Sequence, residues 1–521
     1  MLHIKFFNAF LLLYSRLFLH LVKYPLKGRV VITILSGSGE IPAGALLEPI
    51  PVILYSRNFK LIMKQTFLLF FTISACFIVA GQSNKVKRID SLMRAANEIG
   101  VFNGNVLIAM DKKIIYRAEI GYADTTKTKS LRPELRLAIG SITKEFNSVG
   151  VIMLREKHNL SLNDKVSKYL PELPKWADKI QIKNLLQYTS GLPQSAAESD
   201  SEYLQSLMKL EKLEFEPGTS YNYSNDNVFL QREVIKKVTD LSYKEFIKKY
   251  IFKPLKMDAV LIDASTTNPY IAQSFDNDYN ETTTSQGKNE LYLTIDDLYK
   301  WSEAINTYKL IDKKSTLELS ESFNGKESSL GEAKFDNDKF KLHIHQGSGN
   351  NYEALLYSNP EDNLTILLMT NNQNFKVHQL KDAIVHILND RPYIVPKKSI
   401  YLDIRKKLLN DFNQGIAFYN QIKSTQKNKY DLDGEVFDLY NTGKYLMRRN
   451  RFDDAIKIFY LSTILDLKNS GGISYAFTLI GECYFKSGSK EMAAIYYKKA
   501  LELDATNKTA EGMLKEISRE K

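Results

Sequence analysis

The stretch from Leu137 to Phe146, Leu-Ala-Ile-Gly-Ser-Ile-Thr-Lys-Glu-Phe, constrains this chain more than any other segment. It is small and apolar before Ser141 and has a helical pattern after it. A serine and a lysine three residues apart on a helix share one face, so the amine of Lys144 can take the proton of the Ser141 hydroxyl. Free N–H groups at a helix N-terminus also favour a developing anion. The stretch therefore predicts a nucleophilic serine, with an ordinary capped helix as the alternative.

A second polar segment runs from Phe215 to Asn225 and contains the turn-forming pair Pro217-Gly218. Residues two apart in an extended stretch point the same way, so Tyr223 and Asn225 can enter one cavity together. A phenol beside a lysine ammonium can serve as a base, and an amide side chain can both donate to and accept from a substrate amide. The alternative is a polar loop whose tyrosine caps the core.

A third segment, His345 to Gly349, reads His-Gln-Gly-Ser-Gly. It precedes an apolar run from Ala354 to Tyr357, a Pro-Glu-Asp-Asn turn, and a second apolar run from Leu364 to Met369. This pattern predicts two buried strands joined by a hairpin. The glycines would let a substrate backbone approach the strand edge closely. His345 taken alone is more often a structural residue than a catalytic one.

The order Ser-x-x-Lys, Tyr-x-Asn and then a basic-x-Gly strand resembles that of serine β-lactamases and penicillin-binding proteins. The nearest resemblance is to the class C-like, β-lactamase-related branch, which also holds esterases and D-amino-acid peptidases. It covers about residues 86–390. The resemblance implies an α+β fold, in which an antiparallel sheet flanked by helices is joined to an all-helical region. Further stretches that resemble this branch are Phe102–Ala109, Ile182–Pro193, Ile251–Met257 and Leu293–Trp301.

The resemblance also implies catalytic roles. Ser141 would be the nucleophile that forms an acyl-enzyme. Lys144 would help to deprotonate it, directly or through Tyr223, and which residue is the base is disputed within this superfamily. Tyr223 would also assist proton transfer to the leaving group and to the hydrolytic water. The backbone N–H groups of Ser141 and Ser348 would form the oxyanion hole.

For substrate binding, the resemblance implies that Asn225 holds the substrate amide beside His345 and Gly347. β-Lactamases proper carry Lys-Thr-Gly where this chain has His345-Gln346-Gly347. A lysine is a permanent cation, whereas a histidine is mostly neutral at pH 7. We therefore expect a D-amino-acid peptidase or esterase rather than a true β-lactamase, acting on a small peptide, ester or lactam. The alternative is a non-catalytic sensor or binding protein that keeps the fold.

No cofactor or metal is expected. None of the seven histidines belongs to a His-Glu-x-x-His pattern. His343 and His345 alternate and so should share one strand face, but no third metal ligand is visible. Cys76 and Cys483 lie in unrelated segments, which permits neither a zinc cluster nor a plausible disulfide. Without residues 1–81 the formal charge falls from +11 to about +5, which gives no case for nucleic-acid binding.

The segment 63–81 has a basic start, an apolar core and small residues at its end. It predicts a secretory signal peptide cleaved near Gly81, and hence a protein of the bacterial periplasm or cell envelope. Residues 1–62 resemble no domain, and we interpret them as an over-extended reading of the gene or, alternatively, as a membrane anchor. Ile73–Cys76 resembles a lipoprotein box, so lipidation at Cys76 is a further alternative.

The catalytic region should end near 391–396, where two prolines break the chain. We expect residues 391–434 to form a helical linker, with one long helix over 399–424 and a polar hinge after it. Residues 435–521 contain an internal repeat that resembles the tetratricopeptide pattern, with a period of 38 residues. Such repeats would offer a surface for a protein partner; a plain helical extension is the alternative. The repeated positions are Gly443, Ala455 and Phe459, then Gly481, Ala493 and Tyr497.

Overall fold

The structure is a computed structural model that describes residues 83–519, except 196, 198, 266, 276–289 and 338. The predicted signal peptide, the segment before it and Cys76 lie outside the described residues. Residues 84–521 form one compact unit. Within the described part of the chain, no helix combines the length and the apolar character needed to cross a bilayer.

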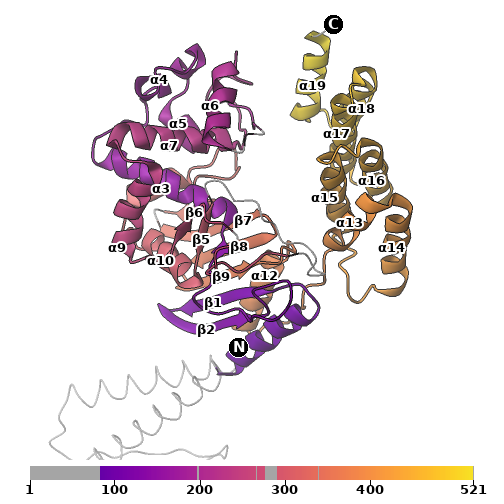
Figure 1. Cartoon of the computed structure of the whole chain (residues 1–521), viewed down its shortest axis with the longest axis horizontal. Coiled ribbons are helices and arrows are strands. Elements are labelled where there is room, and N and C mark those ends of the chain that lie inside the picture. Colours follow the sequence, from indigo (N-terminus) through magenta and orange to yellow (C-terminus); the bar gives the residue numbers. More distant parts are fainter. Residues whose placement is uncertain are drawn as a thin grey trace, which may run out of the picture. The chain divides into compact units, whose positions relative to one another are not determined.

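A six-stranded antiparallel sheet forms the centre of the catalytic region, in the order β2-β1-β9-β8-β7-β6 (Figure 1). The predicted hairpin of two buried strands is confirmed as β8 and β9, which pair from Glu353↔Thr370 to Asn359↔Leu364. The strands are β1 (Gly104–Met110), β2 (Lys113–Ile120), β6 (Glu332–Asp336), β7 (Lys339–Gly349), β8 (Tyr352–Asn359) and β9 (Leu364–Thr370).

Successive side chains of a strand point to opposite faces of the sheet. Each face of this sheet is covered by an apolar core. In β1, Val106 and Ile108 join one apolar core, which includes α12 (Val377–Leu388) and a helix over residues 83–98. Leu107 and Ala109 join the other, larger core with α3 (Thr143–Glu156) and α10 (Ile295–Asn306). The result is a sheet between helical layers (Figure 1).

The rest of the catalytic region is mainly helical and is built around α3. It holds a small sheet in the order β3-β5-β4, which links the nucleophile segment to the strand before α10. This arrangement confirms the predicted α+β fold. Its remaining elements are β3 (Leu137–Ala138), α4 (Val166–Tyr169), α5 (Ile182–Leu186), α6 (Asp200–Lys209), α7 (Asn225–Thr239), α8 (Tyr243–Ile247), α9 (Lys253–Leu255), β4 (Leu261–Ile262), β5 (Leu291–Leu293) and α11 (Lys313–Ser320).

The prediction of one long helix over 399–424 is wrong. The segment forms two helices, α13 (Tyr401–Asn410) and α14 (Phe412–Thr425), which are separated at Asp411. Asp411 is extended, and its carboxylate accepts a 3.0 Å hydrogen bond from the backbone N–H of Gln414. This N-cap starts a new helix where helical periodicity alone had indicated continuity. The two helices cross closely, since a Cβ on Gly415 would lie 2.7 Å from Leu408.

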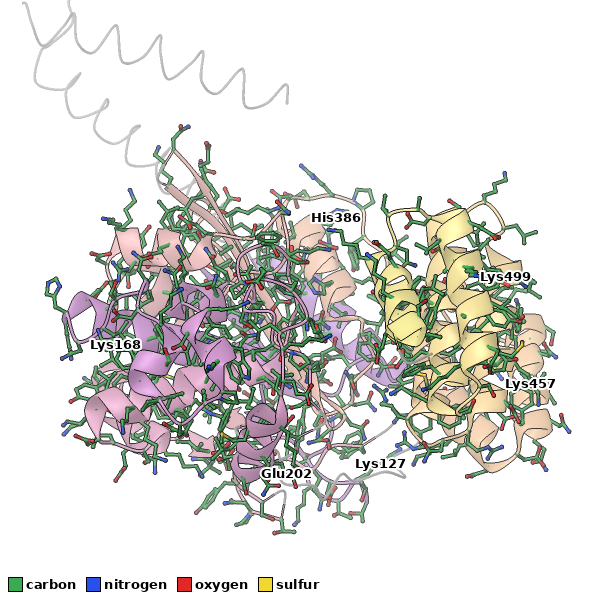
Figure 2. All side chains as sticks on the ribbon, turned by 90° about the horizontal axis from the view of Figure 1, so that it is seen from above. Lys127, Lys168, Glu202, His386, Lys457 and Lys499 are labelled. Atoms are coloured by element: carbon green, nitrogen blue, oxygen red, sulfur yellow. The ribbon has the colours of Figure 1, made fainter. Side chains whose placement is uncertain are left out.

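The C-terminal helices pack closely at the glycines that recur in the sequence. Gly443 faces the ring of Phe459, and Gly481 faces the ring of Tyr497, so closely that a Cβ at either glycine would overlap the ring. The class of repeat stays a prediction. These helices also carry exposed lysine side chains, among them Lys457 and Lys499, which Figure 2 labels. The helices are α15 (Glu435–Met447), α16 (Phe452–Leu465), α17 (Ser470–Lys486), α18 (Lys490–Leu503) and α19 (Lys508–Arg519).

Candidate active site

The candidate nucleophile lies in a tight turn between a strand and a helix. Ser141 is the middle residue of a 3₁₀ turn, Gly140–Ile142, which directly precedes α3. Gly140 has φ +53°, in the left-handed region that side chains disfavour, and a Cβ there would overlap the backbone of Ser348. The turn therefore requires glycine. It holds Ser141 half-buried at the start of the helical segment, as the sequence predicts.

Two polar side chains meet the hydroxyl of Ser141. Lys144 Nζ donates a 3.2 Å hydrogen bond to Ser141 Oγ from the same helical segment. Tyr223 Oη donates a 3.0 Å hydrogen bond to the same oxygen from 82 residues further along the chain. Lys144 Nζ also lies 5.0 Å from the centroid of the Tyr223 ring. The structure thus brings the three predicted catalytic side chains to one oxygen atom, where a proton can pass between them.

Tyr223 is held in place by aromatic packing and by the start of the next helix. Its ring centroid lies 4.9 Å from that of Tyr188, a buried residue that itself packs against Tyr221. Ser224 is extended and caps α7, with its hydroxyl accepting from the backbone N–H of Asp226. The ring of Tyr223 therefore enters the site from just before a helix N-terminus.

Asn225 is the first residue of α7, so the extended stretch predicted for this segment ends there. It is half-buried, and its backbone N–H donates a 2.9 Å hydrogen bond to Gln194 Oε1. Its side chain contacts Tyr203 of α6: burial raises the pKa of Tyr203, and a hydrogen bond with Asn225 opposes that rise. The contacts described for Asn225 are thus with Gln194 and Tyr203, and its entry into the same cavity as Tyr223 stays a prediction.

The third motif lies on β7, directly against the nucleophile turn. A Cβ on Gly347 would lie 1.8 Å from the carbonyl oxygen of Ile139 and 2.7 Å from the backbone nitrogen of Ser141. From the sequence, the absence of a side chain at Gly347 was expected to make room for a substrate backbone. In the structure, that room is taken by the backbone of the turn that carries Ser141. This contact sets the backbone of Ser348 beside that of Ser141, the two residues expected to supply the oxyanion hole.

Beneath β7 a carboxylate connects both strand histidines to the catalytic helix. His345 Nδ1 and His343 Nε2 each lie 2.7 Å from Glu145 Oε1, which confirms that the two histidines share one strand face. Trp301 Nε1 donates a 2.6 Å hydrogen bond to the second carboxylate oxygen, Oε2. All four side chains are buried. The motif sequence gave no sign of Glu145, because it lies 200 residues from His345.

The surroundings of His345 shift it away from the mostly neutral form expected of an isolated histidine at pH 7. Burial by itself would lower the pKa of His345, but hydrogen bonds and charges from Glu145 and Glu327 raise it to about 9. His345 Nε2 lies 3.3 Å from Glu327 Oε1, within ion-pair range. Burial would likewise raise the pKa of Glu145, but His343 and His345 hold it well below its usual range. Both carboxylates therefore favour the charged form of His345.

A second unpredicted carboxyl group adjoins the nucleophile turn. Glu290, just before β5, accepts a 2.7 Å hydrogen bond from the backbone N–H of Gly140. Burial raises its pKa to about 7, although that hydrogen bond and the charge of Lys144 oppose the rise. No motif marks Glu290; its only sequence signal is an acidic residue before an otherwise apolar strand.

Among the residues that the structure describes, no group of three or more histidine, cysteine or acidic side chains is arranged to hold a metal ion. His343 and His345, the one pair that the sequence raised, are bonded to Glu145 instead.

A sheet flanked by helices, with a lysine and a tyrosine donating to one serine oxygen, defines a serine hydrolase that works by acyl transfer. The protein-family model described as Beta-lactamase matches residues 88–389. The chain belongs to this beta-lactamase family. The match does not include the C-terminal helices.

Curated relatives agree with this assignment. The chain is 26% identical over 380 residues to Penicillin-binding protein 4* of Bacillus subtilis, which covers 63% of this chain and 81% of the relative. It is 27% identical over 327 residues to the putative penicillin-binding protein PbpX of the same organism, covering 58% and 80% of the two chains. Protein flp of Staphylococcus aureus is 25% identical over 348 residues, covering 59% and 67%.

Solved structures show the same fold. The octameric penicillin-binding protein homologue from Pyrococcus abyssi has a TM-score of 0.50 and 20% identity, covering 62% of this chain and 81% of that one. The D-amino acid amidase from Ochrobactrum anthropi SV3 also has a TM-score of 0.50 and 20% identity, covering 59% and 98%.

Proposed function

We propose that this protein is a secreted hydrolase that cleaves a small peptide, ester or lactam carbonyl through an acyl-enzyme on Ser141. The observation that carries the proposal is that Ser141 Oγ accepts hydrogen bonds from both Lys144 Nζ, at 3.2 Å, and Tyr223 Oη, at 3.0 Å. A serine is a weak nucleophile unless an adjacent group takes its proton. Here two such groups contact the same oxygen.

In the acylation step, Ser141 Oγ bonds to the carbonyl carbon while its proton passes to the neutral amine of Lys144 or to the phenolate of Tyr223, because a group that donates to Oγ must first lose a proton. The electron pair of the carbonyl moves onto its oxygen, where the backbone N–H groups of Ser141 and Ser348 stabilise it. When the tetrahedral intermediate collapses, the leaving amine or alcohol departs with that proton. A water then attacks the acyl-enzyme by the same route in reverse and frees Ser141.

For the substrate, we favour a D-amino-acid peptide or ester over a β-lactam antibiotic. The fold shared with a D-amino acid amidase supports this choice. The sequence argument against β-lactam substrates assumed a neutral His345, and the shift of its pKa toward the charged form weakens that argument. Relatives with names that refer to penicillin binding support a site that reacts with lactams as well. Asn225, His345 and Gly347 are the residues that we assign to substrate binding.

A turnover comparison tests this function. The protein is assayed with a p-nitrophenyl ester, a D-alanine p-nitroanilide and a chromogenic cephalosporin, beside Ser141→Ala and a control, Ser201→Ala, on the exposed face of α6. We expect the ester and the anilide to be cleaved, with a loss of about 10³-fold or more in Ser141→Ala alone. Cleavage of the cephalosporin alone would overturn the substrate preference. Equal rates in Ser141→Ala would overturn the hydrolase and favour the non-catalytic binding protein.

We further propose that the protein is exported to the bacterial cell envelope after cleavage of the signal peptide at residues 63–81. Residues 86–390 would form the catalytic domain, 391–434 the helical linker and 435–521 tetratricopeptide-like repeats that bind a protein partner. The close helix packing at Gly443 and Gly481 supports the repeats. N-terminal sequencing of the exported protein should find Gln82 first. An intact residue 1 would contradict the signal peptide, and a blocked, lipid-bearing Cys76 would indicate a lipoprotein.

A further inference from the structure

Glu145 is a buried carboxylate beside the site whose hydrogen-bond partners are the third motif and α10. It follows the catalytic Lys144 on α3, yet it binds His343, His345 and Trp301. A fully buried carboxylate is costly unless its oxygens are satisfied, and here both oxygens accept hydrogen bonds. Such an arrangement fixes the groups around it as well as the carboxylate itself.

We propose that Glu145 is a positioning residue that holds His345 as an oriented imidazolium, so that the third-motif strand presents a fixed positive charge beside Ser141. The inference rests on the proposed function, because it assigns that charge to the substrate site of the hydrolase. A lysine at this position carries its own charge, whereas a histidine needs a carboxylate to keep it charged at neutral pH.

The contacts of His345 fix the direction of its ring. Its Nδ1 is bonded to Glu145 on the inner side, and its Nε2 lies 3.3 Å from Glu327 Oε1 on the outer side. Gly331 packs on the ring, since a Cβ there would lie 2.8 Å from His345 Cγ. Beyond the ring, His345 and Glu327 line a cavity of about 380 Å³. The imidazolium ring is therefore buried by its neighbours and lies at the wall of this cavity.

Glu145 is itself held rigidly from the side away from the histidine. Trp301 donates to Oε2, and its indole ring stacks on the ring of Phe146 with 3.8 Å between ring centroids and 20° between their planes. The carboxylate cannot turn away from His345 without losing this hydrogen bond. The helix that carries Lys144 thus also sets the charge and the orientation of the third motif.

The titratable groups that face His345 come from several elements. Glu145 reaches it from α3, Glu327 from the segment before β6, and His343 shares the Glu145 oxygen from β7 itself. Burial raises the pKa of Tyr188 well above its usual value, and the neighbouring Tyr223, Glu327 and Glu145 add to the rise, so Tyr188 stays neutral. The carboxylates are thus the groups that stabilise the charge on His345.

Two measurements on Glu145→Gln test the proposal. The first is the NMR titration of the His345 ring, assigned by its loss in His345→Gln. The wild-type ring should titrate near pH 9, and it should titrate below neutral pH in Glu145→Gln. Glu327→Gln is the matched control, because it removes the outer carboxylate and keeps the Nδ1 bond. Its effect on the titration should be smaller.

The second measurement compares two p-nitrophenyl esters at pH 7.5, one ending in a carboxylate and the other in its methyl ester. In Glu145→Gln, KM for the anionic ester should rise about tenfold or more, the scale of one hydrogen bond to a charged group. Values for the neutral ester should stay within about threefold. Adding His345→Lys to Glu145→Gln should restore binding of the anionic ester, because lysine carries its own charge.

An unchanged His345 titration in Glu145→Gln would overturn the proposal, and so would equal losses for both esters, which indicate a merely structural role. If Glu145→Gln does not fold, the wild-type titration decides, and a ring that is neutral at pH 7 overturns the charge assignment. Failure of the wild-type protein to cleave either ester would instead overturn the hydrolase, and it would leave the histidine titration as a separate result.

Discussion

Replacement of Gly347 by alanine should disable the site through the backbone alone. In the structure a Cβ on Gly347 would lie 1.8 Å from Ile139 O, whereas real Cβ atoms keep at least 3.0 Å, a shortfall of about 1.2 Å. The obstructing atoms are backbone on both sides, so no side chain can rotate away. The strand β7 and the turn that carries Ser141 must therefore separate by about that distance.

The size of the effect follows from this displacement. A misplacement of about 1 Å near the reacting atoms costs about 10²-fold in rate, and loss of one oxyanion donor costs about 10²–10³-fold. Because the shift separates Ser348 N from Ser141 N, we expect a loss of about 10²-fold or more in the rate of ester cleavage. Overpacking should lower the free energy of unfolding by about 1–3 kcal/mol, which leaves the protein folded at 25 °C.

Gly349→Ala is the matched control two residues further along the same strand, since a Cβ there would meet no atom within 4 Å. Both variants are compared with the wild-type protein by initial rates on a p-nitrophenyl ester and by thermal unfolding followed by circular dichroism. Gly349→Ala should retain wild-type rates. A Gly347→Ala protein that cleaves the ester at the wild-type rate would refute the close contact between β7 and the nucleophile turn.

Four further predictions concern single residues. Tyr223→Phe removes one oxygen and should slow ester cleavage about 10²–10⁴-fold with an unchanged Tm, because proton transfer to or from Ser141 is lost. His345 has its pKa raised from 6.5 to about 9, so its stabilising contribution is complete below pH 6.5 and is lost as the pH rises through 9. The difference in unfolding free energy between the wild type and His345→Gln should fall by about 3 kcal/mol over that range, as measured by urea unfolding. Gly481→Ala places a Cβ 2.7 Å from the ring of Tyr497 and should cost about 1–3 kcal/mol. Gly512→Ala in α19 meets no atom within 4 Å and should stabilise its helix by up to about 1 kcal/mol, which the same urea unfolding detects.

Local patterns in the sequence were enough to predict that Ser141 and Lys144 lie together. Ser141 and Lys144 are three residues apart, so helical geometry alone places them together. Tyr223 follows a turn signal. That it would lie near Ser141 was expected only from the resemblance, in which the three motifs occur in the same order. The hairpin of β8 and β9 was readable because two apolar runs flank a turn, a pattern that depends on neighbouring residues only.

The charge of His345 was not predictable from its own segment, because a histidine's pKa depends on what surrounds it in the fold. The carboxylate that sets it, Glu145, is visible in the sequence only as the residue after Lys144. The break between α13 and α14 did leave a signal. Asp411 followed three residues later by Gln414 is a helix-start pattern, and the apolar periodicity that continues through it concealed the start.

The central claim is that Ser141 is an activated nucleophile, and the adduct formed with a fluorophosphonate tests it most directly. After a short incubation, the protein is digested and the adduct is located by mass spectrometry in the wild type, Ser141→Ala and Tyr223→Phe. We expect one adduct on the peptide that contains Ser141, absent in Ser141→Ala and formed much more slowly in Tyr223→Phe. An adduct that persists in Ser141→Ala, or that lies on another serine in the wild type, would contradict the claim.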